Sequence, residues 1–213
     1  MNFSLQAEDI LAKITADTRL GDLRKVAAVI KKDHALALEL WSTGQFLPRQ
    51  LAILIMDKKQ LSQSFIDTLD RDIRQHRPAE QLQLTDWLMA NQLSKDKKTI
   101  SFMETWENSR SSLLRRTFWY YQARLRWVGQ IPPPNSEELI AKIESRIEQE
   151  VPEVQWAMNF TMAQIGIFEE KYRSRCIAFG ERTGLYKDEI VPKNCTPNYL
   201  PQFIAIQVKK LKK

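Results

Sequence analysis

A run of arginine and aromatic residues occupies residues 109–127. On a helix, Arg116, Tyr120 and Arg124 lie four residues apart and share one face, with Arg115 on an adjacent face. Guanidinium groups bind phosphate oxygens, and the rings between them can pack on sugars or bases. The pattern therefore indicates contact with nucleic acid. The alternative is a buried helix whose arginines extend to the surface and pair with acids of neighbouring helices.

Asp86 is the second candidate for chemistry, because it is an acid among apolar residues. Leu82, Leu84 and Trp87 stand close to it in the sequence. A carboxylate beside an indole is partly removed from water, and this costs free energy unless the charge has a task. We therefore consider Asp86 a candidate catalytic group. The alternative is a surface acid at the polar edge of its helix.

Several familiar kinds of site are missing from the sequence. It contains no nucleophile-elbow, P-loop, dinucleotide-binding or zinc-protease motif. Cys176 and Cys195 fit a reducing compartment; they can pair in principle, but no metal-ligand spacing surrounds them. His34 and His76 stand in polar positions near helix ends, where we expect solvated side chains. We expect neither a metal nor a cofactor.

The composition is that of a folded, basic chain. Of its 213 residues, 43% are hydrophobic and 27% charged, and the net charge of +6 favours acidic partners. No apolar run approaches the roughly 18 residues of a membrane span. The first residues lack the basic and apolar regions of a signal peptide. We expect a cytoplasmic protein without membrane contact, built as one helical-repeat domain over residues 1–213.

The elements that must position the candidate residues are helices. Apolar residues recur at helical spacing, and strand-like alternation never lasts beyond a few residues. Asp22 and Asn135 are the predicted N-caps of two helices, Pro48 opens another, and Gly184 is a predicted stop. The predicted helices cover residues 5–14, 23–30, 33–41, 48–55, 63–75, 78–92, 97–107, 109–128, 137–149, 152–167, 169–183 and 202–211. Short connections make neighbours antiparallel, so the pattern predicts an all-α bundle or an α-solenoid of helix pairs.

Several segments together resemble a known family, the bacterial DNA alkylation repair enzymes, which are alkylpurine DNA glycosylases built of HEAT-like repeats. The resemblance covers roughly residues 21–210, and the order and spacing of its motifs carry it. The segments that carry it are Leu40–Trp41, Leu47–Ala52, Thr85–Leu88, Leu113–Thr117 and Val154–Phe160. The resemblance implies a right-handed α-solenoid of HEAT-like antiparallel helix pairs with a basic concave face.

The resemblance also implies roles for individual residues. It makes Asp86 the catalytic carboxylate and Arg116 the arginine that binds the DNA backbone, and it includes Arg49 in its early motif. The residues we expect to bind DNA are Arg116, Arg124, Arg115, Tyr120 and Arg49. Phe160 and Trp87 are the expected lesion-side aromatics. The implied partner is double-stranded DNA with alkylated bases, bound by a monomer, and we expect Asp86, Arg116 and Phe160 to line one concave surface.

Two departures from the family pattern bear on the activity. Active members carry an indole four residues before the aspartate, where this chain has Leu82, and Phe160 replaces a second indole. The lost ring predicts weaker catalysis. The first hypothesis is therefore an alkylpurine glycosylase. The alternatives are a DNA-binding relative without catalysis and a protein-interaction scaffold, a common use of helical repeats.

Overall fold

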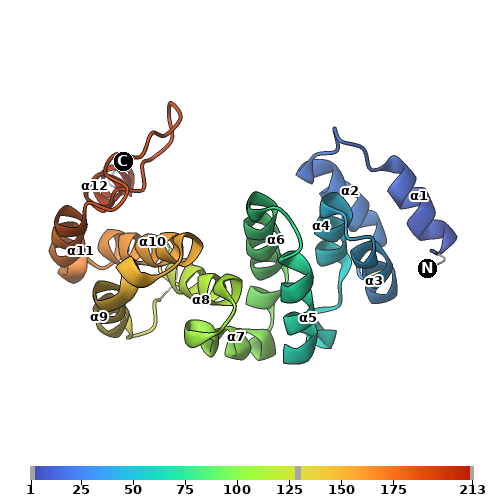
Figure 1. Cartoon of the computed structure of the whole chain (residues 1–213), viewed down its shortest axis with the longest axis horizontal. Coiled ribbons are helices and arrows are strands. Elements are labelled where there is room, and N and C mark those ends of the chain that lie inside the picture. The colour runs from blue at the N-terminus through green and yellow to red at the C-terminus, as the bar shows by residue number, and fades with distance from the viewer. Residues whose placement is uncertain (1–2, 128–130, 212–213) are drawn as a thin grey trace. The chain divides into compact units, whose positions relative to one another are not determined.

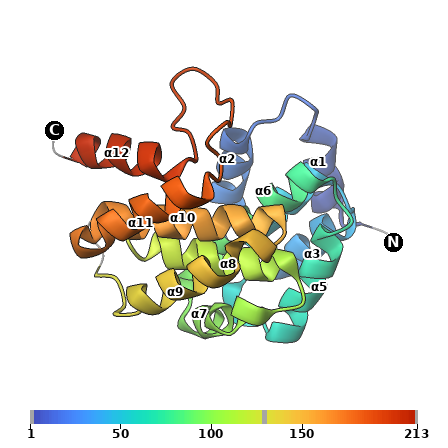
Figure 2. The same ribbon diagram turned by 60° about the vertical axis from the view of Figure 1, so that its left-hand side comes forward.

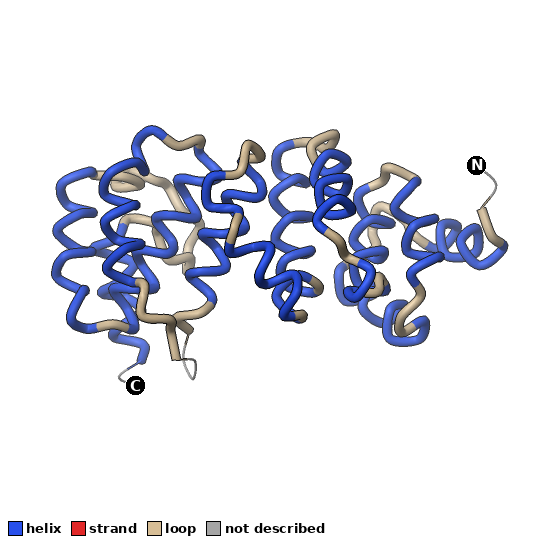
Figure 3. Tube along the Cα trace, turned by 90° about the horizontal axis from the view of Figure 1, so that it is seen from below, coloured by secondary structure: helices blue, strands red, loops and turns tan. Residues whose placement is uncertain are grey.

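The computed structural model describes residues 3–127 and 131–211. Throughout this part of the chain the regular elements are helices, joined by loops and turns (Figure 3). They group into two compact units, Met1–Trp106 and Glu107–Lys213. The single domain expected over residues 1–213 stays a prediction. None of the described helices is long and apolar enough to cross a membrane.

The first unit consists of seven α-helices with short connections, coloured blue to green in Figure 1. They are α1 (Leu5–Lys13), α2 (Leu20–Ile30), α3 (His34–Ser42), α4 (Phe46–Ile55), α5 (Gln63–Ile73), α6 (Pro78–Asn91) and α7 (Lys97–Glu104), with single 3-10 turns at Lys58–Gln60 and Leu93–Lys95. Helix α4 packs against α2, α3 and α6. Leu51, Ile53 and Ile55 of α4 are fully buried there, so α4 forms the centre of this unit.

The second unit is organised around one buried helix. Its helices are α8 (Ser112–Arg124), α9 (Ser136–Arg146), α10 (Pro152–Phe168), α11 (Glu170–Thr183) and α12 (Leu200–Leu211), with a 3-10 turn at Ile147–Gln149. Helix α10 packs along α8 and also contacts α9, α11 and α12 (Figure 2). Ala157, Met158 and Met162 are fully buried. Because most residues of α10 are buried, this helix forms the centre of the unit.

Two glycines let α12 approach α10 and α11 closely. A Cβ added to Gly166 would lie 2.7 Å from Cδ1 of Ile204, and one added to Gly180 would lie 2.7 Å from Cβ of Leu200. These separations are shorter than real Cβ contacts. A larger residue at Gly180 would therefore push α12 away from α11, whereas one at Gly166 would first displace the Ile204 side chain.

The helix ends agree with the sequence in part. Gly184 closes α11 in a left-handed conformation with φ 63°, as predicted. Asp22 is not the N-cap of α2, because this helix begins at Leu20 and the Asp22 carboxylate accepts the Arg19 backbone N–H at 3.2 Å. Asn135 does precede α9, but its side chain makes no capping bond. Its amide oxygen accepts a hydrogen bond from Arg126 at 2.6 Å instead.

Candidate nucleic-acid interface

Arg116 is held in a fixed orientation in the second unit. Helix α8 begins at its N-cap Ser111, whose hydroxyl accepts the Leu114 backbone N–H. One turn further on, the Arg116 guanidinium donates to the Glu153 carbonyl oxygen at 3.1 Å. Its carbon Cζ lies 4.5 Å from the centroid of the Trp156 ring, and the residue is only 4% exposed. Helices α8 and α10 thus position this cation together.

Four aromatic rings continue from Arg116 along α8, α10 and α12. We call Tyr120, Trp156, Phe160 and Phe203 the ring cluster. Trp156 and Phe160 stack in parallel, with centroids 5.1 Å apart and an interplanar angle of 6°. Tyr120 meets both rings edge-on, at 5.7 and 5.6 Å, and Phe203 meets Phe160 edge-on at 5.9 Å. These contacts join the expected site residues Arg116, Tyr120 and Phe160 in one assembly.

Trp156 was not among the site residues expected from the sequence. It stands four residues before Phe160, so both rings occupy one face of α10. Arg116 and Tyr120 have the same spacing on α8. Two residue pairs with the same four-residue spacing can face each other when two helices pack side by side. This shared spacing is the signal in the sequence that could have identified Trp156.

The two other arginines of this segment have different surroundings. Arg115 is half-buried and forms an ion pair with Glu150 at 3.0 Å, and it also donates to the Ser109 carbonyl oxygen at 2.8 Å. The alternative interpretation predicted such a pairing with an acid, although Glu150 lies in the turn before α10 and not in a helix. Arg124 lies over the ring of Trp127, with Cζ 4.8 Å from the centroid. A stacked guanidinium keeps its donors directed along the ring plane, where phosphate oxygens can reach them.

Asp86 belongs to the first unit. It is half-buried on α6, and the neighbouring residues Leu84 and Leu88 of that helix are buried in the core. The Trp87 indole donates to the Gln50 carbonyl oxygen at 3.1 Å, and the Arg24 guanidinium lies over its ring at 4.9 Å. Arg116 and Phe160 are in the second unit. Their sharing of one concave surface with Asp86 stays a prediction.

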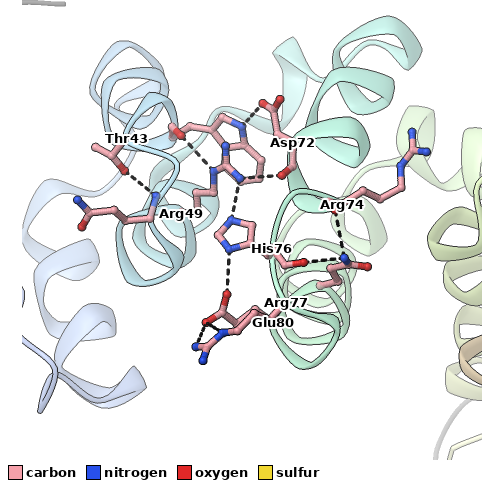
Figure 4. A network of polar contacts seen from close by, with 10 residues as sticks. Thr43, Arg49, Asp72, Arg74, His76, Arg77 and Glu80 are labelled. Carbon is pink, nitrogen blue, oxygen red and sulfur yellow. Dashed lines mark hydrogen bonds and ion pairs between the residues drawn. The ribbon is translucent and has the colours of Figure 1, made fainter.

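Arg49 and His76 differ from expectation (Figure 4). Arg49 is 7% exposed, and its donors go to the backbone oxygens of Trp41 and Asp72 and to Nε2 of His76, the last at 2.7 Å. This environment does not fit a DNA contact, because the guanidinium is committed to joining α3, α4 and the end of α5. Burial lowers the pKa of Arg49.

His76 is buried, with 7% of its side chain exposed, and is not solvated as expected. Since Arg49 can only donate, Nε2 of His76 accepts, and Nδ1 carries the proton towards Glu80 at 3.1 Å (Figure 4). Arg77 also bonds the Glu80 carboxylate, and these hydrogen bonds lower the pKa of Glu80. The imidazole therefore links a buried cation to a carboxylate.

The two cysteines are both free, Cys176 in the core and Cys195 on the surface. Within residues 3–127 and 131–211, no three His, Cys, Asp or Glu side chains gather as metal ligands do. The chemistry that these residues offer is that of carboxylate, guanidinium and aromatic groups.

Comparisons with known proteins identify the fold and the family of this chain. No curated protein matches the chain. The chain is similar to a solved structure described as a new family of proteins related to the HEAT-like repeat DNA glycosylases with affinity for branched DNA structures. The TM-score is 0.69 at 17% identity, covering 98% of this chain and 88% of that chain, which confirms the all-α, HEAT-like fold. The sequence profile described as DNA alkylation repair enzyme matches residues 17–178. Because this match covers most of the chain, the protein belongs to the DNA alkylation repair enzyme family.

Proposed function

We propose that this protein is a DNA glycosylase that hydrolyses the N-glycosidic bond of cationic N3- or N7-alkylated purines in duplex DNA. Such a purine departs as a neutral base, so the bond needs little help from a general acid. The reaction instead needs stabilisation of the oxocarbenium-like sugar and a positioned water. A fixed carboxylate near C1′ serves both needs, and Asp86 is the residue that we assign to this task.

The observation that carries the proposal is the match of the DNA alkylation repair enzyme profile over residues 17–178, a range that includes Asp86 and Arg116. Two features of the site support it. Asp86 is half-buried on a helix anchored by apolar residues, so its carboxylate is positioned before a substrate arrives. Arg124 provides a cation beside an aromatic ring for the DNA backbone, whereas Arg116, which is 4% exposed and bonded to α10, orients the neighbouring rings.

Leu82 leads us to expect a low rate of base release. An aromatic ring beside the sugar stabilises a positive transition state by about 0.5–2 kcal/mol, and the middle of this range corresponds to roughly a ten-fold change in rate. Leu82 is aliphatic and half-buried on α6, so it cannot supply this term. We therefore expect base release that is measurable but slow.

The test is release of methylated purines from alkylated duplex DNA by the full-length protein. We expect Asp86→Asn to lower the release rate roughly 100-fold or more, because the amide keeps the shape but not the charge. Asp17→Asn, an exposed aspartate of the first unit, is the matched control and should retain the wild-type rate. Equal release by wild type and Asp86→Asn would refute the catalytic assignment.

A second candidate function is DNA binding without catalysis. Leu82 favours it, as does the similarity to a structure described as having affinity for branched DNA. Binding that weakens steeply with salt, together with no base release, would select this function. Absence of DNA affinity at low salt would favour a protein-interaction scaffold.

A further inference from the structure

A small pocket in the second unit lies between α10 and α12. Its volume is about 260 Å³, below the roughly 300–1,000 Å³ of pockets that take drug-sized ligands. Its walls include the rings of Trp127, Phe160, Phe168 and Phe203, and the side chains of Gln164 and Gln207. A pocket of this size, walled by rings and amides, suits one planar polar ring system.

Gln164 gives the pocket its polar character. The residue is 5% exposed, yet its amide makes no hydrogen bond with any residue that the structure describes. Because Gln164 lines the pocket, its amide donors and acceptor are open to a molecule inside it. Gln207, opposite on α12, donates Nε2 to Thr196 at 3.3 Å, and its carbonyl oxygen takes no part in that bond. The unpaired amide of Gln164 therefore points to a ligand with its own donors and acceptors.

Cations stand close to this pocket. Arg124 lies over the Trp127 ring at 4.8 Å. Lys209 and Lys210 are exposed on α12, two and three residues after the pocket residue Gln207. A ring-lined pocket beside positive charge is the arrangement with which proteins hold unpaired bases of a nucleic acid.

We propose that this pocket binds one unpaired nucleobase of DNA, stacked among its rings and hydrogen-bonded by Gln164 and Gln207. This inference rests on the proposed binding of DNA. It concerns a place for an unpaired base and not the carboxylate chemistry of Asp86. An amide can pair with a base edge through both a donor and an acceptor, so the pocket distinguishes a base from an empty sugar.

The test compares three fluorescein-labelled duplexes by anisotropy. One carries a single unpaired adenine, the second carries a base-free sugar analogue at that position, and the third is fully paired. We expect wild type to bind the adenine duplex roughly 5- to 150-fold more tightly than the base-free one, the range for stacking one base. Phe203→Leu and Gln164→Met should each reduce this preference. Ile206→Ala, on the same helix but outside the pocket lining, should retain it.

Gln164→Met also serves as a control for folding. It conserves the volume and removes the amide, so we expect it to unfold cooperatively in urea like wild type while losing the preference for the base. Equal affinity of wild type for the adenine and base-free duplexes would overturn the pocket proposal and leave DNA binding intact. An unchanged preference in both pocket variants would overturn it as well. If the protein binds none of the three duplexes at low salt, the proposed function itself is wrong.

Discussion

The Arg116 guanidinium lies 4.5 Å from the centroid of the Trp156 ring and donates to a carbonyl oxygen of the same helix, α10. Arg116 is therefore fixed by a ring and a backbone acceptor. The indole and the guanidinium form one rigid assembly, although they come from different helices.

The first prediction concerns the energy of this contact. Because Arg116 is 4% exposed, its cation–π interaction with Trp156 should approach about 2 kcal/mol, the value for desolvated pairs. A double-mutant cycle with Arg116→Gln, Trp156→Leu and the double variant, followed by urea unfolding, measures the coupling. A coupling energy near zero would show that the two residues stabilise the unit independently.

The second prediction concerns Arg124 and salt. If Arg124 neutralises one phosphate, Arg124→Gln should reduce the slope of log affinity against log salt by about 0.9. Lys25→Gln is the control, because Lys25 is exposed on α2 and pairs with Asp22. Anisotropy titrations of a duplex at several salt concentrations give both slopes. An unchanged slope for Arg124→Gln would remove Arg124 from the proposed interface.

The third prediction concerns pH and the ion pair of Glu144 with Arg175, which joins α9 and α11. Nε and Nη2 of Arg175 donate to the two carboxylate oxygens at 3.0 and 2.7 Å, and these bonds lower the pKa of Glu144. The stabilisation is therefore present above the unfolded pKa of a glutamate and is lost as the pH falls through the lower folded value.

Glu144→Gln should accordingly destabilise the protein at neutral pH and have little effect in acid. Arg175 is 38% exposed, so solvent screening limits the loss to about 1 kcal/mol or less. Urea unfolding of wild type and variant at neutral pH and in acid measures the loss of unfolding free energy under each condition. Glu148→Gln, an exposed neighbour of the same sign, should show no such pH dependence. A loss that is equal at both pH values would contradict the charge argument.

The fourth prediction concerns a buried charge. The Arg126 side chain is fully buried and pairs with Glu169 at 3.1 Å; burial lowers the pKa of Arg126, and Glu169 opposes that shift. Removing one partner of such a pair leaves the other charge uncompensated. Glu169→Ala should therefore cost about 3–5 kcal/mol in unfolding free energy, against well under 1 kcal/mol for the exposed Glu170→Ala. Similar losses for the two variants would mean that water compensates Arg126.

The fifth prediction separates the two cysteines. Burial raises the pKa of the Cys176 thiol to about 12, so this residue stays protonated and unreactive near neutral pH. Cys195 is exposed. A maleimide should label Cys195 alone in the native protein and both thiols in urea. Cys195→Ser should give no native labelling; rapid labelling of this variant would show that the core around Cys176 opens readily.

Much of the fold could be predicted from local patterns. Apolar spacing located the helices, and glycine at residue 184 marked a stop because it adopts a left-handed conformation easily. The side chain of Asn135 could not be placed from local patterns. Its type and position predicted a capping bond, yet the buried guanidinium of Arg126 takes its amide oxygen. That partner stands nine residues earlier in the chain, before α9 begins, and nothing in the sequence around Asn135 indicates it.

In the candidate site, too, local spacing was predictable and tertiary contacts were not. The spacing of Arg116, Tyr120 and Arg124 identified one helix face correctly, because i, i+4 neighbours are a local property. Arg49 and His76 were misjudged because each is buried by a partner from another helix. A polar residue near a helix end looks solvated until its tertiary contacts are known. The role of Trp156 likewise depends on the pairing of α8 with α10.

The close approach at Gly166 and Gly180 has a consequence for comparing relatives. The matched profile ends at residue 178, whereas α12, which supplies Phe203 and Gln207, begins at Leu200. The nucleobase pocket therefore combines a wall from the matched region with a wall from beyond it. Gly166 and Gly180 lie directly against α12, the helix that forms this second wall. They can serve as a signature for sorting homologues into those able to build the pocket and those that share only the common helices.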